Sequence, residues 1–311
     1  MKAFLARRFL AAIVSIIGVT LVVTLFLRAI PGDAVDVMLG EQAGEVDREA
    51  LREAIGLHLP PHMQVWTFIR DIATGELRTS LPPFRARVLP LIGEKLPKTM
   101  LLAVVAMLLA IAMAIPLGVL SARKQGTATD HGAMIFSLVG VSVPQAWLGP
   151  VLILVFAIHL GWLPALGGEG ARAIVLPAIT LSLGMMAMLS RMTRSSVLDV
   201  NREDFVTTAR AKGLAERTVI WRHVVRNALV PVITIAGLQF GALLAGAIVT
   251  EKIFNWPGMG TLLIESIQRR DYNTVRACVL VFTVLYVLVN LVTDIAYGIV
   301  DPRIRVRGGK R

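Results

Sequence analysis

Six long apolar stretches limit the architecture open to this chain. Each holds 18 to 28 residues, and charged residues gather in the segments between them. The stretches cover residues 9–27, 99–122, 132–159, 173–190, 230–250 and 277–300. A helix of about 20 apolar residues crosses the hydrocarbon core of a bilayer, because each residue adds about 1.5 Å. The pattern therefore predicts an all-α integral membrane protein with six transmembrane helices.

Composition supports the same class of protein. The chain has 311 residues, 55% of them hydrophobic, and a mean hydropathy of +0.69. A secretory signal is the alternative for the first stretch, but its nineteen uncharged residues exceed a signal's apolar region, and no small-residue cleavage site follows Arg28. We therefore expect an uncleaved first span.

The single cysteine, Cys278, cannot form an internal disulfide and is expected to pack inside the protein.

The distribution of charge predicts which side of the membrane each segment faces. With both termini inside, the inner segments hold 18 Lys and Arg against 6 acids, and the outer segments hold 13 against 14. Lys and Arg concentrate on the cytoplasmic side of membrane proteins. The net charge of +11 is thus explained by orientation, and no basic groove with interleaved aromatics indicates nucleic acid. Both termini are expected in the cytoplasm.

These boundaries divide the chain into four parts. They are the cytoplasmic end and first span at 1–29, an extracytoplasmic helical region at 30–98, a five-helix domain at 99–300 and a basic tail at 301–311. Amphipathic patterns predict two helices in the outer region, at 45–55 and 62–73, with Pro60 and Pro61 between them. These helices are expected to cap the outer end of a membrane pathway.

Some residues inside the apolar stretches are unusual for a membrane helix. Pro144 and Pro150 predict a kink in the third stretch, either packed against neighbouring helices or beside a water-lined path. Asn290 and Asp294 lie in the sixth stretch. An acid within a span is a functional candidate, although the position of Asp294 near the cytoplasmic end also suits a structural ion pair or a solvated end.

A polar and basic segment at residues 201–231 separates the fourth and fifth apolar stretches. Asn201 is expected to cap a first short helix, with Asp204 favouring its amino end. Gly213 suits the left-handed residue that ends a helix, and a second helix is expected at 215–229. Its apolar stripe comprises Ile220, Trp221, Val224, Val225, Ala228 and Leu229. The segment is either a solvated cytoplasmic loop or a coupling element for another subunit.

Motifs in this segment resemble those of a known family. Thr-Ala-Arg-Ala-Lys-Gly at 208–213 and Arg-His-x-x-Arg-Asn-Ala at 222–228 resemble the EAA coupling loop of permease subunits of ATP-binding-cassette importers. The resemblance points to the dipeptide, oligopeptide and nickel permease family, and to the first of its two homologous permeases. Further similar motifs lie at 31–33, 75–80, 254–260, 270–272 and 301–305. The loop's Glu-Ala-Ala falls here on Thr207, Thr208 and Ala209, and Arg78 stands where the family usually has a glycine.

The resemblance implies two groups of site residues. Contact with a separate ATPase is expected from Asp204, Thr207, Thr208, Ala209, Arg210, Ala211, Lys212, Gly213, Leu214, Glu216, Arg217, Arg222 and His223. Docking of a binding protein, or gating outside the membrane, is expected from Pro31, Gly32, Asp33, Trp256, Pro257, Gly258, Gly260, Asp271 and Tyr272.

The sequence contains no P-loop and no arrangement of nucleophile and base, so the chain is not expected to be an enzyme. No cofactor or metal is expected on it, and ATP and Mg²⁺ are assigned to partner subunits. The resemblance implies a bacterial inner-membrane heterodimer of this chain with a homologous second permease, two cytoplasmic ATPase subunits and an extracytoplasmic solute-binding protein.

The cargo and two other classes of function stay open at this point. Peptides or peptide-like solutes are the expected cargo, with nickel, a metal chelate or glutathione as alternatives. A secondary carrier driven by an ion gradient is a rival, although such carriers usually have charged residues at mid-membrane depth. A receptor that docks a soluble partner without transporting a solute is a second rival.

Overall fold

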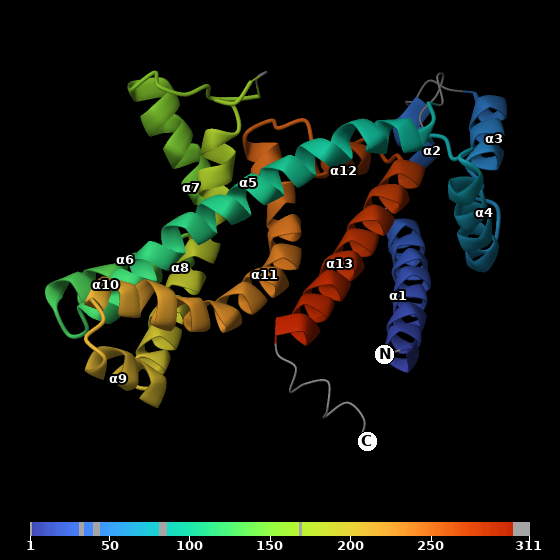
Figure 1. Ribbon diagram of the computed structural model, residues 1–311. Coiled ribbons are helices and arrows are strands. Elements are labelled where there is room, and N and C mark those ends of the chain that lie inside the picture. The colour runs from blue at the N-terminus through green and yellow to red at the C-terminus, as the bar shows by residue number, and fades with distance from the viewer. Residues whose placement is uncertain (1, 31–33, 40–43, 81–85, 168–169, 301–311) are drawn as a thin grey trace. The chain divides into compact units, whose positions relative to one another are not determined.

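The computed structural model describes residues 2–30, 34–39, 44–80, 86–167 and 170–300. Within these ranges the regular structure is helical, apart from a bridge between Arg78 and Arg87. Figure 1 shows the helices in chain order from blue to red. They are α1 (Lys2–Ala29), α2 (Ala34–Leu39), α3 (Glu45–Ala54), α4 (Pro61–Thr74), α5 (Val88–Arg123), α6 (Ala128–Ser142), α7 (Gln145–Leu152), the π-helical η1 (Ile153–His159), α8 (Val175–Val200), α9 (Asp204–Ala211), α10 (Glu216–Thr218), the π-helical η2 (Val219–Val225), α11 (Arg226–Ile253), α12 (Met259–Gln268) and α13 (Tyr272–Val300). The predicted all-α membrane architecture is confirmed.

The count of membrane crossings differs from six continuous helices. Among the described residues, four helical runs are long and apolar enough to cross: Val88–Arg123, Val175–Val200, Glu216–Ile253 and Tyr272–Thr293. The helix pair of α6 and of α7 with η1 is bent by 103° and makes a fifth crossing if it is one broken span. In α1 the described apolar part is the shorter Ile13–Ala29. Each predicted stretch is helical, but the predicted number of continuous spans is not exact.

The third stretch is broken where a kink was expected. Val143 leaves the helical region, with φ −79° and ψ 119°, immediately before Pro144. A residue before proline is pushed toward extended backbone, and proline itself has no N–H to continue the helix. Pro150 remains inside α7, and η1 begins three residues later. The two prolines therefore have different effects, and of the two only Pro144 follows a break in the helix.

The predicted helix at 215–229 and the predicted span at 230–250 are one helical run. It extends from Glu216 to Ile253 and contains Pro231, so the expected end before that proline is wrong. The run includes a π-helical part, η2, that ends six residues before the proline. Such wider turns interrupt regular α-helical hydrogen bonding without ending the helix.

The chain forms two compact units, residues 1–100 with 257–288, and residues 101–256 with 289–311. In the first unit α1 packs against α4, while α2 and α3 pack around Val35, Leu51 and Ile55. The two helices predicted in the outer region are confirmed as α3 and α4. The short helices α2 and α12 were not predicted. Cys278 is fully buried, as expected.

In the second unit α8 packs against α6, α7 and α11, and a buried ion pair joins α8 to the start of α6. Asp130 is 1% exposed, and Arg194 donates to both of its carboxylate oxygens, through Nε and Nη2, at 2.7 Å each. The Ser121 hydroxyl and the Gly126 amide also donate to Asp130. A buried carboxylate is tolerated when its oxygens are paired in this way. The sequence did not indicate this pair, because 64 residues separate its members.

Close packing of α5 on α8 generates a test of the fold. A Cβ added at Gly118 would lie 2.5 Å from Thr193 Cβ and 2.6 Å from the Ser190 carbonyl oxygen. Gly118→Ala is therefore expected to destabilise the protein by about 1–3 kcal/mol, the usual cost of overpacking. The measurement is thermal unfolding of the detergent-solubilised chain, followed by tryptophan fluorescence.

Gly132→Ala is the matched control, because it lies in α6 and a Cβ there would meet nothing within 4 Å. It should keep the wild-type midpoint or raise it, since alanine is favoured over glycine in a helix by about 0.5–1 kcal/mol. Equal midpoints for the two variants would contradict the close packing.

Candidate coupling site

The polar segment 201–231 begins differently from the prediction. Helix α8 continues to Val200, ten residues beyond the predicted span, and Asn201 follows as its last turn closes. Glu203, in extended backbone, precedes α9. The expectation that Asn201 caps the first short helix is therefore wrong, because Asn201 belongs to the end of the preceding helix. Asp204 does lie in the first turn of α9, where its charge suits the helix dipole.

The turn after α9 is built as the sequence predicted. Gly213 has φ +76°, the left-handed region that glycine enters without strain. Its amide donates to the Arg210 carbonyl at 2.9 Å, and the Leu214 amide donates to the Ala209 carbonyl at 3.4 Å. These two bonds make the paired closure typical of a helix end with a left-handed glycine. Leu214 stays 42% exposed, so its side chain is available to a partner.

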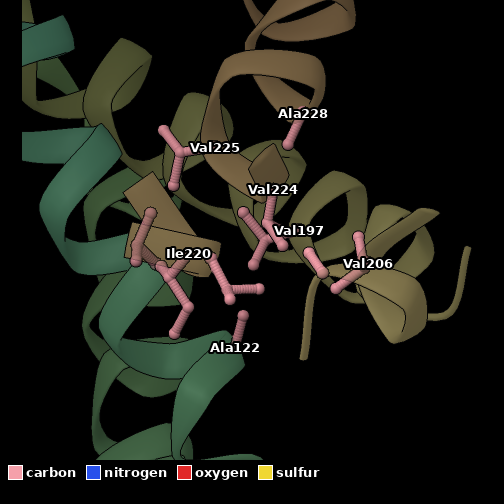
Figure 2. Packing of buried hydrophobic residues seen from close by; sticks show 10 residues of the cluster. Ala122, Val197, Val206, Ile220, Val224, Val225 and Ala228 are labelled. Carbon is pink, nitrogen blue, oxygen red and sulfur yellow. The ribbon is translucent and has the colours of Figure 1, made fainter. Parts of the chain in front are cut away.

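A hydrophobic cluster lies beneath α9 and fixes it to the spans. Its side chains come from the ends of α5 and α8, from α9, and from η2 with the start of α11, and Figure 2 shows them converging on one interior. The buried members are Val119, Ala122, Val197, Val206, Ala209, Val219, Ile220, Val224, Val225 and Ala228. Fully burying one valine is worth about 1.5–3 kcal/mol. The segment is therefore a packed part of the second unit, and not a solvated loop.

Arg210 links both sides of the glycine turn. Its Nε and Nη2 donate to the Glu216 carboxylate at 3.2 and 2.9 Å, and Nη2 also donates to Asn201 Oδ1 at 2.7 Å. The hydrogen bonds that Arg210 donates to Glu216 raise the pKa of the Arg210 guanidinium, which keeps it charged. The pair is exposed, so its contribution to stability is small, about 0–1 kcal/mol. Its geometry nevertheless holds the end of α8, α9 and α10 in one arrangement.

The face of α9 opposite the cluster is exposed and low in relief. Helical spacing places Asp204, Thr207, Thr208 and Ala211 there, and all four are exposed. We call these four residues, with the exposed turn Lys212–Leu214, the coupling surface. Because Thr207, Thr208 and Ala211 have small side chains, another protein can approach the helix backbone closely. Phe205, 43% exposed, lies at its edge.

The remaining coupling candidates lie on α10 and η2. Glu216, Arg217 and Arg222 are exposed, and His223 is half-buried. Trp221 is 49% exposed, so its predicted place on the buried apolar stripe is wrong. The prediction assumed α-helical spacing, whereas a π-helical segment turns neighbouring residues through different angles. The contact of these residues with an ATPase stays a prediction.

The outer candidates lie mainly inside the protein. The buried carboxylate of Asp271 accepts from the Ser80 amide at 2.7 Å and the Thr274 hydroxyl at 2.6 Å, so it joins two of the motifs that resemble the family. Trp256, Gly258, Gly260 and Tyr272 are buried and Pro257 is half-buried. Pro31, Gly32 and Asp33 lie outside the described residues. Docking of a binding protein at these residues stays a prediction. Because most of them are buried, exposed residues beside them would have to make the contact.

The polar candidates in α13 are only partly described. Asn290 is half-buried. Asp294 lies in the helix, but its side chain is outside the described residues. The choice between a functional and a structural role for Asp294 therefore stays open.

Comparison with known proteins matches almost the whole chain. A model of binding-protein-dependent transport system inner membrane components matches residues 114–306, and a model of the amino-terminal part of such components matches residues 1–103.

Named relatives are similar over nearly their full length. An oligopeptide transport system permease of Bacillus subtilis is 39% identical, over 98% of this chain and 99% of its own. A di/tripeptide transport system permease of Pseudomonas aeruginosa is 41% identical, with the same coverage. A glutathione transport system permease of Salmonella typhimurium is 37% identical, over 99% of this chain and all of its own.

Two solved structures share the fold. The inward-facing methionine ABC transporter matches with a TM-score of 0.57 at 16% identity, over 68% of this chain and 97% of its own. An amino acid ABC transporter crystallised with histidines matches at 0.50 and 14%, over 67% and 94%. With helical spans, a packed coupling segment and full-length relatives in agreement, the chain belongs to the binding-protein-dependent inner membrane components, the permease subunits of ATP-binding-cassette importers.

Proposed function

We propose that this chain forms half of the pathway of an ATP-driven importer for di- or oligopeptides or similar solutes, and that an ATPase subunit binds it at the coupling surface. The observation that carries the proposal is the rigid attachment of α9 to the spans through the hydrophobic cluster. The cargo class is supported by relatives named for oligopeptides, di/tripeptides and glutathione.

In the proposed assembly, a homologous second permease, two ATPase subunits and an extracytoplasmic binding protein complete the importer. ATP and Mg²⁺ belong to the ATPase subunits in this scheme, and the chain itself performs no chemistry. It lies in a bacterial inner membrane with both termini in the cytoplasm. The distribution of Lys and Arg supports that orientation.

The mechanism follows from what α9 is attached to. When ATP closes the ATPase pair, the coupling surface moves with it. Because the cluster joins α9 to the ends of α5 and α8 and to η2, a displacement of α9 is passed to three helical runs at once. Packed interfaces tend to switch between discrete arrangements. The spans therefore tilt together and open the pathway to one side or the other.

The coupling surface generates a labelling prediction. Thr208 is exposed, while the native Cys278 is fully buried and should not react. Thr208→Cys is expected to react with a membrane-impermeant maleimide in inside-out vesicles but not in intact cells. Co-expression of the ATPase subunits should block that reaction. Ala73→Cys, exposed on α4, is the matched control and should react from outside. Labelling of Thr208→Cys in intact cells would contradict the proposed topology, because it would place residue 208 outside the membrane.

The glycine turn generates a prediction about coupling. Gly213→Val puts a β-branched residue at φ +76°, a strain of about 1–3 kcal/mol, although the space around it is open. The variant should insert normally but lose most ATP-dependent peptide uptake, because the turn and the coupling surface shift. Uptake and ATPase activity are measured in proteoliposomes containing the whole complex.

Two variants separate this effect from general strain. Gly213→Asn should retain uptake, since asparagine tolerates the left-handed region. Gly161→Val introduces the same kind of strain at φ +62°, also in open space, outside the coupling segment, and should keep coupling. Full uptake by Gly213→Val would contradict the role given to the turn, and uptake insensitive to vanadate would favour a gradient-driven carrier.

A further inference from the structure

The first unit contains a polar pocket that the coupling function does not use. Its volume is about 300 Å³, and it is lined by the loop after α3, by α4, by residues 76–78 and by the first two turns of α13. Small-molecule sites range from about 300 to 1,000 Å³, so this one suits a small ligand. Its charged and amide side chains are Glu53, Gln64, Asp71, Glu76, Arg78, Asn273 and Arg276.

Arg276 is the most buried charged group of this pocket. It is 8% exposed, and its guanidinium carbon lies 5.3 Å from the centre of the Phe68 ring. Nη2 donates to Asn273 Oδ1 at 2.7 Å, and Nε donates to the Tyr272 carbonyl at 3.4 Å. These bonds and the ring fix the orientation of the guanidinium plane. They use only two of its five N–H donors.

Arg276 has no carboxylate partner among the described residues, where none lies within 4.0 Å of its nitrogens. The neighbouring carboxylate of Asp271 accepts hydrogen bonds from Ser80 and Thr274, so its charge reaches Arg276 through space without a bond, as does the like charge of Arg28. A guanidinium removed from water is costly unless an anion pairs with it. Its flat fork of donors matches a carboxylate, which it can bind through two parallel hydrogen bonds.

The acids of the pocket determine which kind of anion fits. Glu53, Asp71 and Glu76 line the same space, and of these only Asp71 has an ion pair, with Arg70 at 3.0 Å, among the described residues. These three carboxylates outnumber the two guanidinium groups of the lining, those of Arg78 and Arg276, and disfavour a ligand of net negative charge. A simple amine would leave Arg276 without a hydrogen-bonded anion. A molecule carrying both a carboxylate and an ammonium group satisfies both halves of the lining.

We infer that this pocket binds a small zwitterion, of the size of an amino acid or dipeptide, with its carboxylate against Arg276 and its ammonium group toward the acids. The site is separate from the coupling surface. It lies in the region expected outside the membrane, so it would meet solutes before they enter the pathway.

The test is a calorimetric titration of the full-length chain in lipid nanodiscs with the dipeptide dialanine, without a binding protein. Saturable binding is expected for the wild type, and Arg276→Gln should weaken it about tenfold or more, as loss of charge-assisted hydrogen bonds does. Dialanine with an amidated carboxyl end and dialanine with an acetylated amino end should each bind more weakly than the zwitterion.

Two further variants keep the result interpretable if Arg276→Gln folds poorly. Asn273→Asp retains Arg276 but places a carboxylate at the atom that Nη2 already contacts, so an internal ion pair should block dialanine. Arg87→Gln removes an exposed arginine of the same unit outside the pocket and should bind normally.

The inference is overturned if the wild type shows no saturable binding, if Asn273→Asp binds as tightly as the wild type, or if amidation has no effect. Because ATP-driven uptake is measured separately, failure here leaves the proposed importer function standing. Labelling of Thr208→Cys in intact cells, or full uptake by Gly213→Val, would contradict the proposed function but leave the inference about this pocket standing.

Discussion

The packing of ten apolar side chains beneath α9 is the interaction on which the coupling segment depends. An isolated helix of eight residues is not stable in water, because forming its first turn costs more than its few hydrogen bonds return. Here Val206 and Ala209 anchor the helix by burial against α5, α8 and η2. The coupling surface is consequently rigid relative to the ends of those helices, which a mechanical role requires.

The ion pair of Asp130 and Arg194 complements this cluster in the same unit. The apolar packing of the cluster has no preferred direction, whereas the two parallel hydrogen bonds of the ion pair fix how the start of α6 meets α8. Removing one partner would leave a buried charge uncompensated, which typically costs about 3–5 kcal/mol. Packing and a directional polar contact thus act together around the end of α8, which leads into α9.

Departures from regular helix occur near three of the prolines in the apolar stretches. Pro144 follows a break in the helix, Pro150 is followed by η1, and η2 precedes Pro231. Irregular backbone inside a membrane must find partners in neighbouring protein or water. Such places are also where a helix bends most readily. The run from α10 to α11 contains one of them, η2, just after the coupling surface.

The sequence by itself determined the membrane class, the helical character of every apolar stretch, α3 and α4, and the turn at Gly213. These follow from local chemistry: hydrophobicity over about 20 residues, amphipathic spacing, and a residue type that tolerates positive φ. Its motifs also indicated the family, because the residues of a coupling loop are adjacent in the chain.

Tertiary structure decided the rest. Asn201 looked like a helix start because its side chain suits a cap, but packing of α8 extends that helix to Val200. The predicted place of Trp221 on the buried apolar stripe was wrong, because the spacing of apolar residues in the sequence does not indicate a π-helical turn. The pair of Asp130 and Arg194, and the pocket around Arg276, join residues from distant segments. Such contacts depend on how helices pack in three dimensions, and a linear pattern carries no record of which side chains that packing brings together.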